Sequence, residues 1–193
     1  MSNIVRAGVI PFTIKNNRLY FLLGIDNNTG EFTDFGGGLK KGEQAVDTAY
    51  REFNEESCNL FNNYVTKKDV NNSLFLVNLK GTIAIYFVKI DFFWLDNINK
   101  NFSTYQKNHR NIKKHNELRG IKWVNKEEFE NIAFNYKCNY MWKKIQNIFI
   151  NNTTSEKLYS NLFFRTELNE SIKNSILNLL NTITTNFTKE LMV

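Results

Sequence analysis

The chain has 193 residues, of which 42% are hydrophobic and 15% aromatic, with nine glycines and one proline. This length and apolar content predict one compact globular domain, with room for a small extension. The formal net charge of +6 favours a polyanionic partner such as a nucleotide, RNA or an inositol phosphate. Cys58 and Cys138 stand far apart with no CxxC pair, which argues against a zinc site and a disulfide framework.

The beginning of the chain, MSNIVRAGVIPF, lacks the long apolar run of a cleavable signal. No apolar stretch approaches the roughly 20 residues that a membrane helix needs. The cysteine usage is typical of a reducing compartment. These features predict an unprocessed, soluble, cytoplasmic protein without a membrane partner.

Two strands and a helix are predicted first along the chain. Residues 4–12 and 19–25 are rich in β-branched and aromatic residues, and the turn signal KNN separates them, so they predict paired strands. The clearest helix is expected over residues 43–59. Its less charged side carries Ala45, Ala49, Tyr50 and Phe53 near helical spacing.

The remaining elements predict an α+β order with a helical tail. Strands are expected at 74–79 and 82–93, with a tight turn at Lys80-Gly81, and again at 121–124. The polar, asparagine-rich segment 97–119 predicts a long exposed loop. A short helix capped by Asn125 is expected over 127–132, followed by helices over 136–150 and 168–191 that the polar stretch 151–155 joins.

The predicted helix over 43–59 carries three adjacent carboxylates. Glu52, Glu55 and Glu56 stand at i, i+3 and i+4, so they share one helix face. Each like-charged pair costs about 0.2–0.5 kcal/mol unless a cation lies between the two carboxylates. Because all of these ligands are oxygens, the face indicates a hard divalent ion, Mg²⁺ or Mn²⁺, and chemistry on phosphates.

A glycine loop precedes this helix with a defined spacing. Glycines at 36–38 let the backbone approach a metal or a phosphate closely, and Arg51 can orient a neighbouring carboxylate. Residues 37–56 satisfy the pattern G-x5-E-x7-R-E-U-x-E-E, in which U is aliphatic or aromatic and Glu43 is the first glutamate. A Glu-rich helix by itself indicates only a solvated face. The joint spacing favours a catalytic site instead.

The pattern resembles the box of the Nudix hydrolase family. The resemblance implies a Nudix α/β/α sandwich, a mixed β-sheet flanked by helices, over residues 1–150, with residues 151–193 as a C-terminal helical extension packed on it. It also implies metal-dependent cleavage of a pyrophosphate bond in a nucleoside diphosphate linked to another moiety, by water attack on phosphorus. The implied metal-binding set comprises the three helix glutamates, Glu52, Glu55 and Glu56, and the backbone at Gly36 and Gly37. Glu43 and Arg51 support that set.

The sequence departs from the family box at two positions. Cys58-Asn59 stands where the box closes with glycine and an apolar residue, which leaves the geometry of the helix exit open. Lys40 replaces an acid that is often found three positions before Glu43. It adds a cation near the phosphate path, so it is a candidate substrate-binding residue.

Several candidates lie outside the box. Glu117, ahead of the predicted strand at 121–124, resembles the acid that acts in the family as a base or an additional ligand, so the catalytic set is Glu52, Glu55 and Glu117. An exposed loop glutamate is the alternative. We expect Phe12, Trp94 and Trp142 in the core. The densest basic run is a candidate substrate-binding surface or a solubilising loop: Lys107, Arg110, Lys113 and Lys114.

Three functions remain open at this stage. The first is a hydrolase of soluble nucleotide diphosphate derivatives. The second is a decapping enzyme or 5′-end RNA pyrophosphohydrolase acting on capped or triphosphorylated RNA, which the net charge and the basic run favour. The third is a nucleotide or RNA sensor without turnover. The last helix either packs on the sandwich or forms a homodimer contact.

Overall fold

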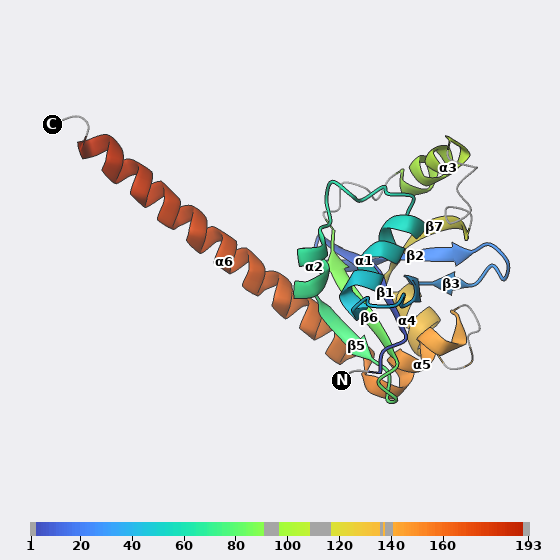
Figure 1. Ribbon diagram of the computed structural model, residues 1–193. Coiled ribbons are helices and arrows are strands. Elements are labelled where there is room, and N and C mark those ends of the chain that lie inside the picture. Colours follow the sequence, from blue (N-terminus) through green and yellow to red (C-terminus); the bar gives the residue numbers. More distant parts are fainter. Residues whose placement is uncertain (1–2, 91–96, 109–116, 136, 138–140, 191–193) are drawn as a thin grey trace.

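The computed structural model describes residues 3–90, 97–108, 117–135, 137 and 141–190, with only the backbone described for 177 and 179–190 (Figure 1). These residues form one mixed sheet of seven strands in the order β3-β2-β1-β6-β5, with β4 on β1 and β7 on β2. The strands are β1 Arg6–Lys15, β2 Arg18–Asp26, β3 Phe32–Thr33, β4 Phe35–Gly38, β5 Leu74–Val77, β6 Ile83–Lys89 and β7 Leu118–Asn125.

The first two strands form the predicted hairpin. Asn16 and Asn17 make its turn with φ angles of 50° and 58°. Asparagine tolerates this left-handed conformation better than most residues, and a turn with two such residues matches the twist of paired strands. Both strands extend beyond the predicted ranges, to Lys15 and Asp26.

Strand β1 is central because it pairs antiparallel with β2 and β4 and parallel with β6. Gly8 of β1 faces Gly36 of the glycine strand β4. A Cβ on Gly8 would lie 2.8 Å from the Cα of Gly36 and 2.1 Å from the Oδ2 of Asp34. The close approach of these strands therefore requires glycine, and it places the glycine loop against the middle of the sheet.

Alternating side chains on the strands build two cores, one on each face of the sheet. One core lies under α1 (Ala45–Glu56), α2 (Lys67–Asn72) and α3 (Ile98–Asn108), and includes Ala7, Phe35 and Phe53. The other lies under α4 (Lys126–Phe134), α5 (Lys143–Asn152) and the start of α6 (Ser155–Glu190), and includes Phe21 and Phe129. The predicted α/β/α sandwich with a mixed sheet is confirmed (Figure 1).

Helix α1 is shorter than the predicted range 43–59, because its exit is a tight left-handed turn. The N–H of Asn59 donates to the carbonyl of Asn54 at 2.7 Å, and the N–H of Cys58 to that of Glu55 at 3.2 Å. This bond pair defines a Schellman motif. Cys58 has a φ of 55°, so the cysteine adopts the conformation for which glycine is the usual residue.

The prediction of a loop over 97–119 is wrong for its described part. Residues Ile98–Asn108 form α3, and residue 118 already belongs to β7. Ile98, Phe102 and Tyr105 recur at i, i+4 and i+7, and the first two are buried. That stripe was hidden in an asparagine- and lysine-rich segment. Arg110, Lys113 and Lys114 lie outside the described residues, as does Trp94.

The helices of the second half begin elsewhere than predicted, although the Asn125 cap is confirmed. The Asn125 side chain accepts a hydrogen bond from the N–H of Glu128 at 2.8 Å. Helix α5 begins at Lys143 instead of residue 136, and α6 begins at Ser155 instead of residue 168. Thr154 caps α6, since its Oγ1 accepts from the N–H of Lys157 at 3.2 Å.

Only the first turns of α6 are buried against the sandwich. Leu158, Tyr159 and Leu162 are buried, Arg165 and Glu170 still contact the body, and the helix then runs away from it (Figure 1). An apolar stripe further along is open to solvent, with exposed fractions of 64%, 49%, 51% and 53% at Phe164, Leu168, Ile172 and Ile176. Within the described residues, no helix combines the length and apolarity needed to cross a bilayer.

Candidate active site

The face of α1 that carries the glutamates meets the glycine strand β4. The backbone N–H of Gly36 donates to the Oε2 of Glu56 at 2.9 Å. A Cβ on Gly37 would lie 2.5 Å from the carboxyl carbon of Glu52. The absence of side chains on these two glycines therefore lets the carboxylates approach the backbone.

Arg51 binds the outer part of this face. Its Nε and Nη2 donate to the two carboxylate oxygens of Glu43 at 2.7 and 2.9 Å, a bidentate pair. Its Nη1 donates to Glu52 and, at 3.3 Å, to Glu55, and its Nη2 also donates to the carbonyl of Gly38 at 3.1 Å. The hydrogen bond from Arg51 holds the pKa of Glu43 well below its usual range. The geometry suits the supporting role proposed for Glu43 and Arg51.

Glu56 is the most buried of the three glutamates, with 7% of its surface exposed. Burial and, next, the negative charge of Asp34 raise the pKa of Glu56 well above its usual range. The charge of Glu117 acts in the same direction, whereas Arg6 and the Gly36 N–H lower the pKa. A buried carboxylate close to two others is a place where a cation would be stabilised.

Arg6 and Asp34 form a buried ion pair behind the glycine strand. The guanidinium donates to both carboxylate oxygens, at 2.9 and 2.7 Å, and its Nη2 also donates to the Gly36 carbonyl at 3.0 Å. Asp34 is fully buried. The sequence analysis missed both residues, because the pair depends on the register between β1 and β4. The sequence does contain one indication of Asp34, because this acid stands directly before Phe35 and three glycines.

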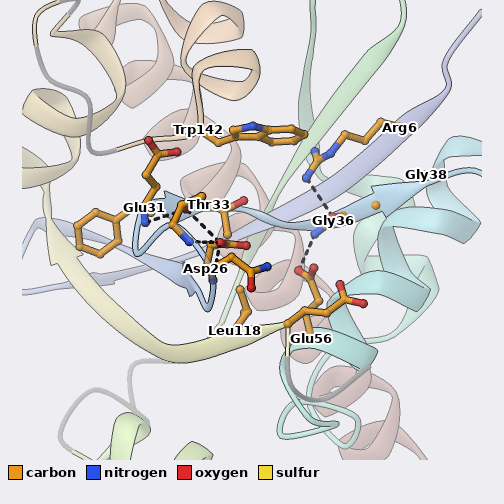
Figure 2. Close-up of a pocket in the computed structure, with 14 residues that line it drawn as sticks. Arg6, Asp26, Glu31, Thr33, Gly36, Gly38, Glu56, Leu118 and Trp142 are labelled. Atoms are coloured by element: carbon orange, nitrogen blue, oxygen red, sulfur yellow. Dashed lines mark hydrogen bonds between the residues drawn. The ribbon is translucent and has the colours of Figure 1, made fainter. Parts of the chain in front are cut away.

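These elements surround a cavity of about 500 Å³ (Figure 2). Glu56 and Gly36 line one end of it, and Glu117, whose charge acts on Glu56, and Gly37 are also among its lining residues. The β2–β3 connection lines the other end, together with Trp142, which precedes α5. The expectation of a core position is confirmed for Phe12, whereas Trp142 is only partly buried: it packs against the second core and also lines the cavity. Trp142 is held there because its N–H donates to the Phe32 carbonyl at 3.1 Å.

The structure brings together part of the predicted site. Glu56 and Glu117 share the cavity, while Glu52 and Glu55 contact Arg51 and are not among the residues that line it. Lys40 and Lys107 are exposed and do not line the cavity. In the part of the chain that the structure describes, no group of three or more His, Cys, Asp or Glu side chains is gathered closely enough to hold a metal ion. The carboxylates are thus neighbours without forming a closed ligand set.

Comparison with known proteins gives one short sequence match and many structural ones. No family model matches the chain. An uncharacterised protein of Acanthamoeba polyphaga mimivirus is 40% identical over 67 residues, which are 32% of this chain and 22% of that protein. The match thus spans about a fifth of that relative.

The solved structures with similar folds include Nudix proteins. The Ap4A hydrolase of C. elegans, in a binary complex, has a TM-score of 0.47 at 18% identity, over 82% of this chain and 98% of that one. A MutT/Nudix family protein from Listeria innocua has a TM-score of 0.46 at 14% identity, over 87% and 99% of the two chains. Both TM-scores lie below 0.5 and both identities below 20%, so these matches by themselves assign no function to the chain.

Proposed function

We propose that this chain is a divalent-metal-dependent pyrophosphohydrolase of the Nudix type, which cleaves a nucleoside diphosphate linked to another moiety. One observation carries the proposal. The segment 37–56, with its glycine and glutamate spacing, folds as a strand and a helix, and Glu56 of that helix lines a 500 Å³ cavity together with the glycines and Glu117. Cavities of this size accommodate small organic ligands. Carboxylates beside a close-approaching glycine backbone suit metal-assisted chemistry on phosphates.

The donor set fits a hard cation by its chemistry. All candidate ligands are oxygens, and Glu56 is buried beside other acids, which raises its pKa and would favour a cation next to its carboxylate. Mg²⁺ or Mn²⁺ would be held by Glu52, Glu55 and Glu56, with a carbonyl from Gly36 or Gly37. Glu52 and Glu55 would then turn from Arg51, which keeps its bidentate pair with Glu43.

Different residues would have different roles in the reaction. A bound metal would neutralise negative charge on the pyrophosphate oxygens. Glu117 faces the cavity beside Glu56, where its carboxylate can accept the proton of the attacking water. Arg6 holds the Gly36 carbonyl in place, and Arg51 orients the outer carboxylates.

The decisive experiment is a substrate panel. Purified protein is incubated with dinucleoside polyphosphates, nucleotide sugars, ADP-ribose and capped RNA, with Mg²⁺ or Mn²⁺, in water enriched in ¹⁸O. We expect hydrolysis of at least one pyrophosphate, abolished by chelator, with one ¹⁸O atom in a phosphate product. No turnover of any pyrophosphate, with either metal, would contradict the proposal.

The alternative of binding without turnover has one observation in its favour, since the described carboxylates form no closed metal-ligand group. Tight nucleotide binding without hydrolysis in the panel would select it. For the RNA alternative, replacement of Lys107, Arg110, Lys113 and Lys114 by alanine provides the test. If these side chains bind RNA phosphates, the slope of log affinity against log salt falls by up to about 3–4 units, and a small nucleotide shows little change.

A further inference from the structure

The cavity is acidic although the chain is basic. Among the described residues that line it, Asp26, Glu31, Glu56 and Glu117 are acids and Arg6 is the one cation. The charge of Arg6 is already paired with Asp34 at 2.7 Å. At the Glu56 end, the proposed metal would compensate the phosphates of a substrate. At the far end, Asp26 and Glu31 are the charged residues of the β2–β3 connection that line the cavity, whereas Lys144 and Arg119 lie near that end without lining it, so a phosphate inside the cavity there would face acids first.

The far end is built on a fixed loop between β2 and β3. The Oδ1 of Asp26 accepts hydrogen bonds from the N–H groups of Asn28 and Thr29 at 2.9 and 2.7 Å. The N–H of Asp26 donates to the Glu31 carbonyl at 2.9 Å, and the N–H of Glu31 donates to the Thr29 hydroxyl at 3.2 Å. Both backbone groups of Glu31 are therefore fixed.

The Glu31 side chain, in contrast, has no bonding role within the described residues. It is half-buried in the cavity wall, and its carboxylate makes no hydrogen bond or ion pair with any residue that the structure describes. In Figure 2 it lies at the same end of the cavity as Trp142, away from Glu56. A carboxylate is an acceptor only, so a half-buried one favours a ligand with donors.

Trp142 provides an aromatic surface at this end. Its backbone is fixed on β3 through the 3.1 Å bond to the Phe32 carbonyl. The Arg6 guanidinium carbon and the Lys144 ammonium nitrogen lie over the indole ring, 5.1 and 5.3 Å from its centre, so cations already contact part of the aromatic surface. A rigid indole beside an acceptor suits a planar, uncharged ring that carries N–H donors.

We propose that this end of the cavity binds a purine base with two adjacent N–H donors, as in guanine, with Glu31 accepting both hydrogen bonds and Trp142 contacting the ring. The inference rests on the proposed function, because it names the base of the substrate. Adenine presents one donor beside a ring-nitrogen acceptor on the corresponding edge. That acceptor would face the carboxylate, so adenine is disfavoured.

Binding of free nucleosides tests this without metal or turnover. The full chain is titrated with guanosine and, separately, with adenosine in the presence of a chelator. Binding is measured from the NMR signals of the tryptophan indole N–H groups. We expect guanosine to bind at least about 10-fold more tightly than adenosine. Glu31→Gln, which can both donate and accept, should weaken guanosine by about 10-fold or more and remove the preference for it.

Matched variants separate the two contacts. Trp142→Ala should weaken both nucleosides by about 5-fold or more without altering their ratio, and Trp142→Phe should restore part of the loss. Glu156→Gln, an exposed acid at the start of α6, should change neither affinity. Thermal unfolding checks that each variant folds.

Equal affinities in the wild-type protein, undetectable binding, or an unchanged preference in Glu31→Gln would overturn the inference. The substrate panel above would still decide the proposed hydrolysis independently, since that panel reads turnover with metal and this titration reads base binding without it.

Discussion

At the cavity end of the sandwich, side chains are fixed by partners far away in the sequence, whereas the outer part of α6 extends from the body with an open apolar stripe. Arg6 binds Asp34, and Gly36 binds Glu56, across 28 and 20 residues. Beyond Leu162, α6 continues to carry apolar residues at helical spacing, yet Leu168, Ile172 and Ile176 are about half exposed. Its side-chain contacts with the body there include a 3.4 Å bond from Arg165 and a 3.4 Å ion pair from Glu170.

The difference shows that a hydrophobic pattern and a buried position are separate properties. Helical periodicity forms a stripe in both α1 and α6, but the body covers the stripe of α6 only as far as Leu162. In the body, close packing makes charge changes costly, because a buried charge needs its partner. In the outer part of α6, side chains are solvated already, so changes there should cost the sandwich little.

The largest expected effect is on catalysis at Glu56. Glu56→Gln keeps the volume of the side chain and removes the negative charge from the candidate metal face, so kcat should fall by about 1000-fold or more. Glu55→Gln should also remove most of the activity. The free energy of unfolding without metal should stay the same or rise, since repulsion between carboxylates falls. Steady-state kinetics at saturating Mg²⁺ and urea unfolding measure the two quantities, and near wild-type kcat in Glu56→Gln would sink the metal-site assignment.

A second prediction concerns the buried pair. Asp34→Asn leaves the Arg6 guanidinium without its counter-charge, so the free energy of unfolding should fall by about 3 kcal/mol. The double variant Arg6→Met with Asp34→Asn should lose less than the sum of the two single variants, because no uncompensated charge remains. Chemical denaturation of the four proteins completes the cycle. Additive losses would mean that the two residues are not coupled.

The third prediction compares a thiol in the body with one on α6. Burial raises the pKa of the Cys58 thiol to about 11, so at pH 8 its thiolate fraction is about 100-fold below that of an ordinary cysteine. In a Cys138→Ser background, Cys58 should react with iodoacetamide at least about 100-fold more slowly than a cysteine introduced by Ser171→Cys. The rate at Cys58 should still rise towards pH 11, whereas the α6 thiol levels off above about pH 8.5. Equal alkylation rates of the two thiols at pH 8 would show that the region around Cys58 opens often enough to make its thiol as accessible as the one on α6.

The smallest effect is expected for removal of residues 171–193. Described side chains in this segment are exposed, so Tm should change by less than about 2 °C. Differential scanning calorimetry and analytical ultracentrifugation of the full and shortened chains measure the effect. A fall of more than about 5 °C together with a loss of dimer would show instead that a second copy covers the stripe.

The site was predictable from the sequence to the extent that its residues are close along the chain. Glu52, Glu55 and Glu56 share a face because the helix repeat places them there, and Arg51 reaches Glu55 for the same reason. The glycines before α1 could be assigned to close backbone contact. A Cβ at Gly37 would lie 2.5 Å from the carboxyl carbon of Glu52, which confirms that the contact leaves no room for a side chain. Arg6, Asp34 and Trp142 could not be assigned, since each has a partner from another element, and Glu31 could not because only the folded cavity shows where its side chain lies.

The sequence by itself determined strands β1, β2, β5, β6 and β7, the β1–β2 turn, helix α1 and the carboxylate spacing, because these depend on side-chain periodicity and on the turn preferences of asparagine and glycine. It predicted neither β3 nor β4, and β4 contains the glycines that were expected in a loop. Tertiary structure decided the rest. Only the sheet covers Ile98 and Phe102 and so stabilises α3 in a polar segment, and only the register of β4 on β1 buries Asp34 against Arg6. The position of Trp142 in the cavity wall follows likewise from a backbone bond to β3. Local propensity cannot specify such contacts, because their free energy comes from groups that only folding brings together.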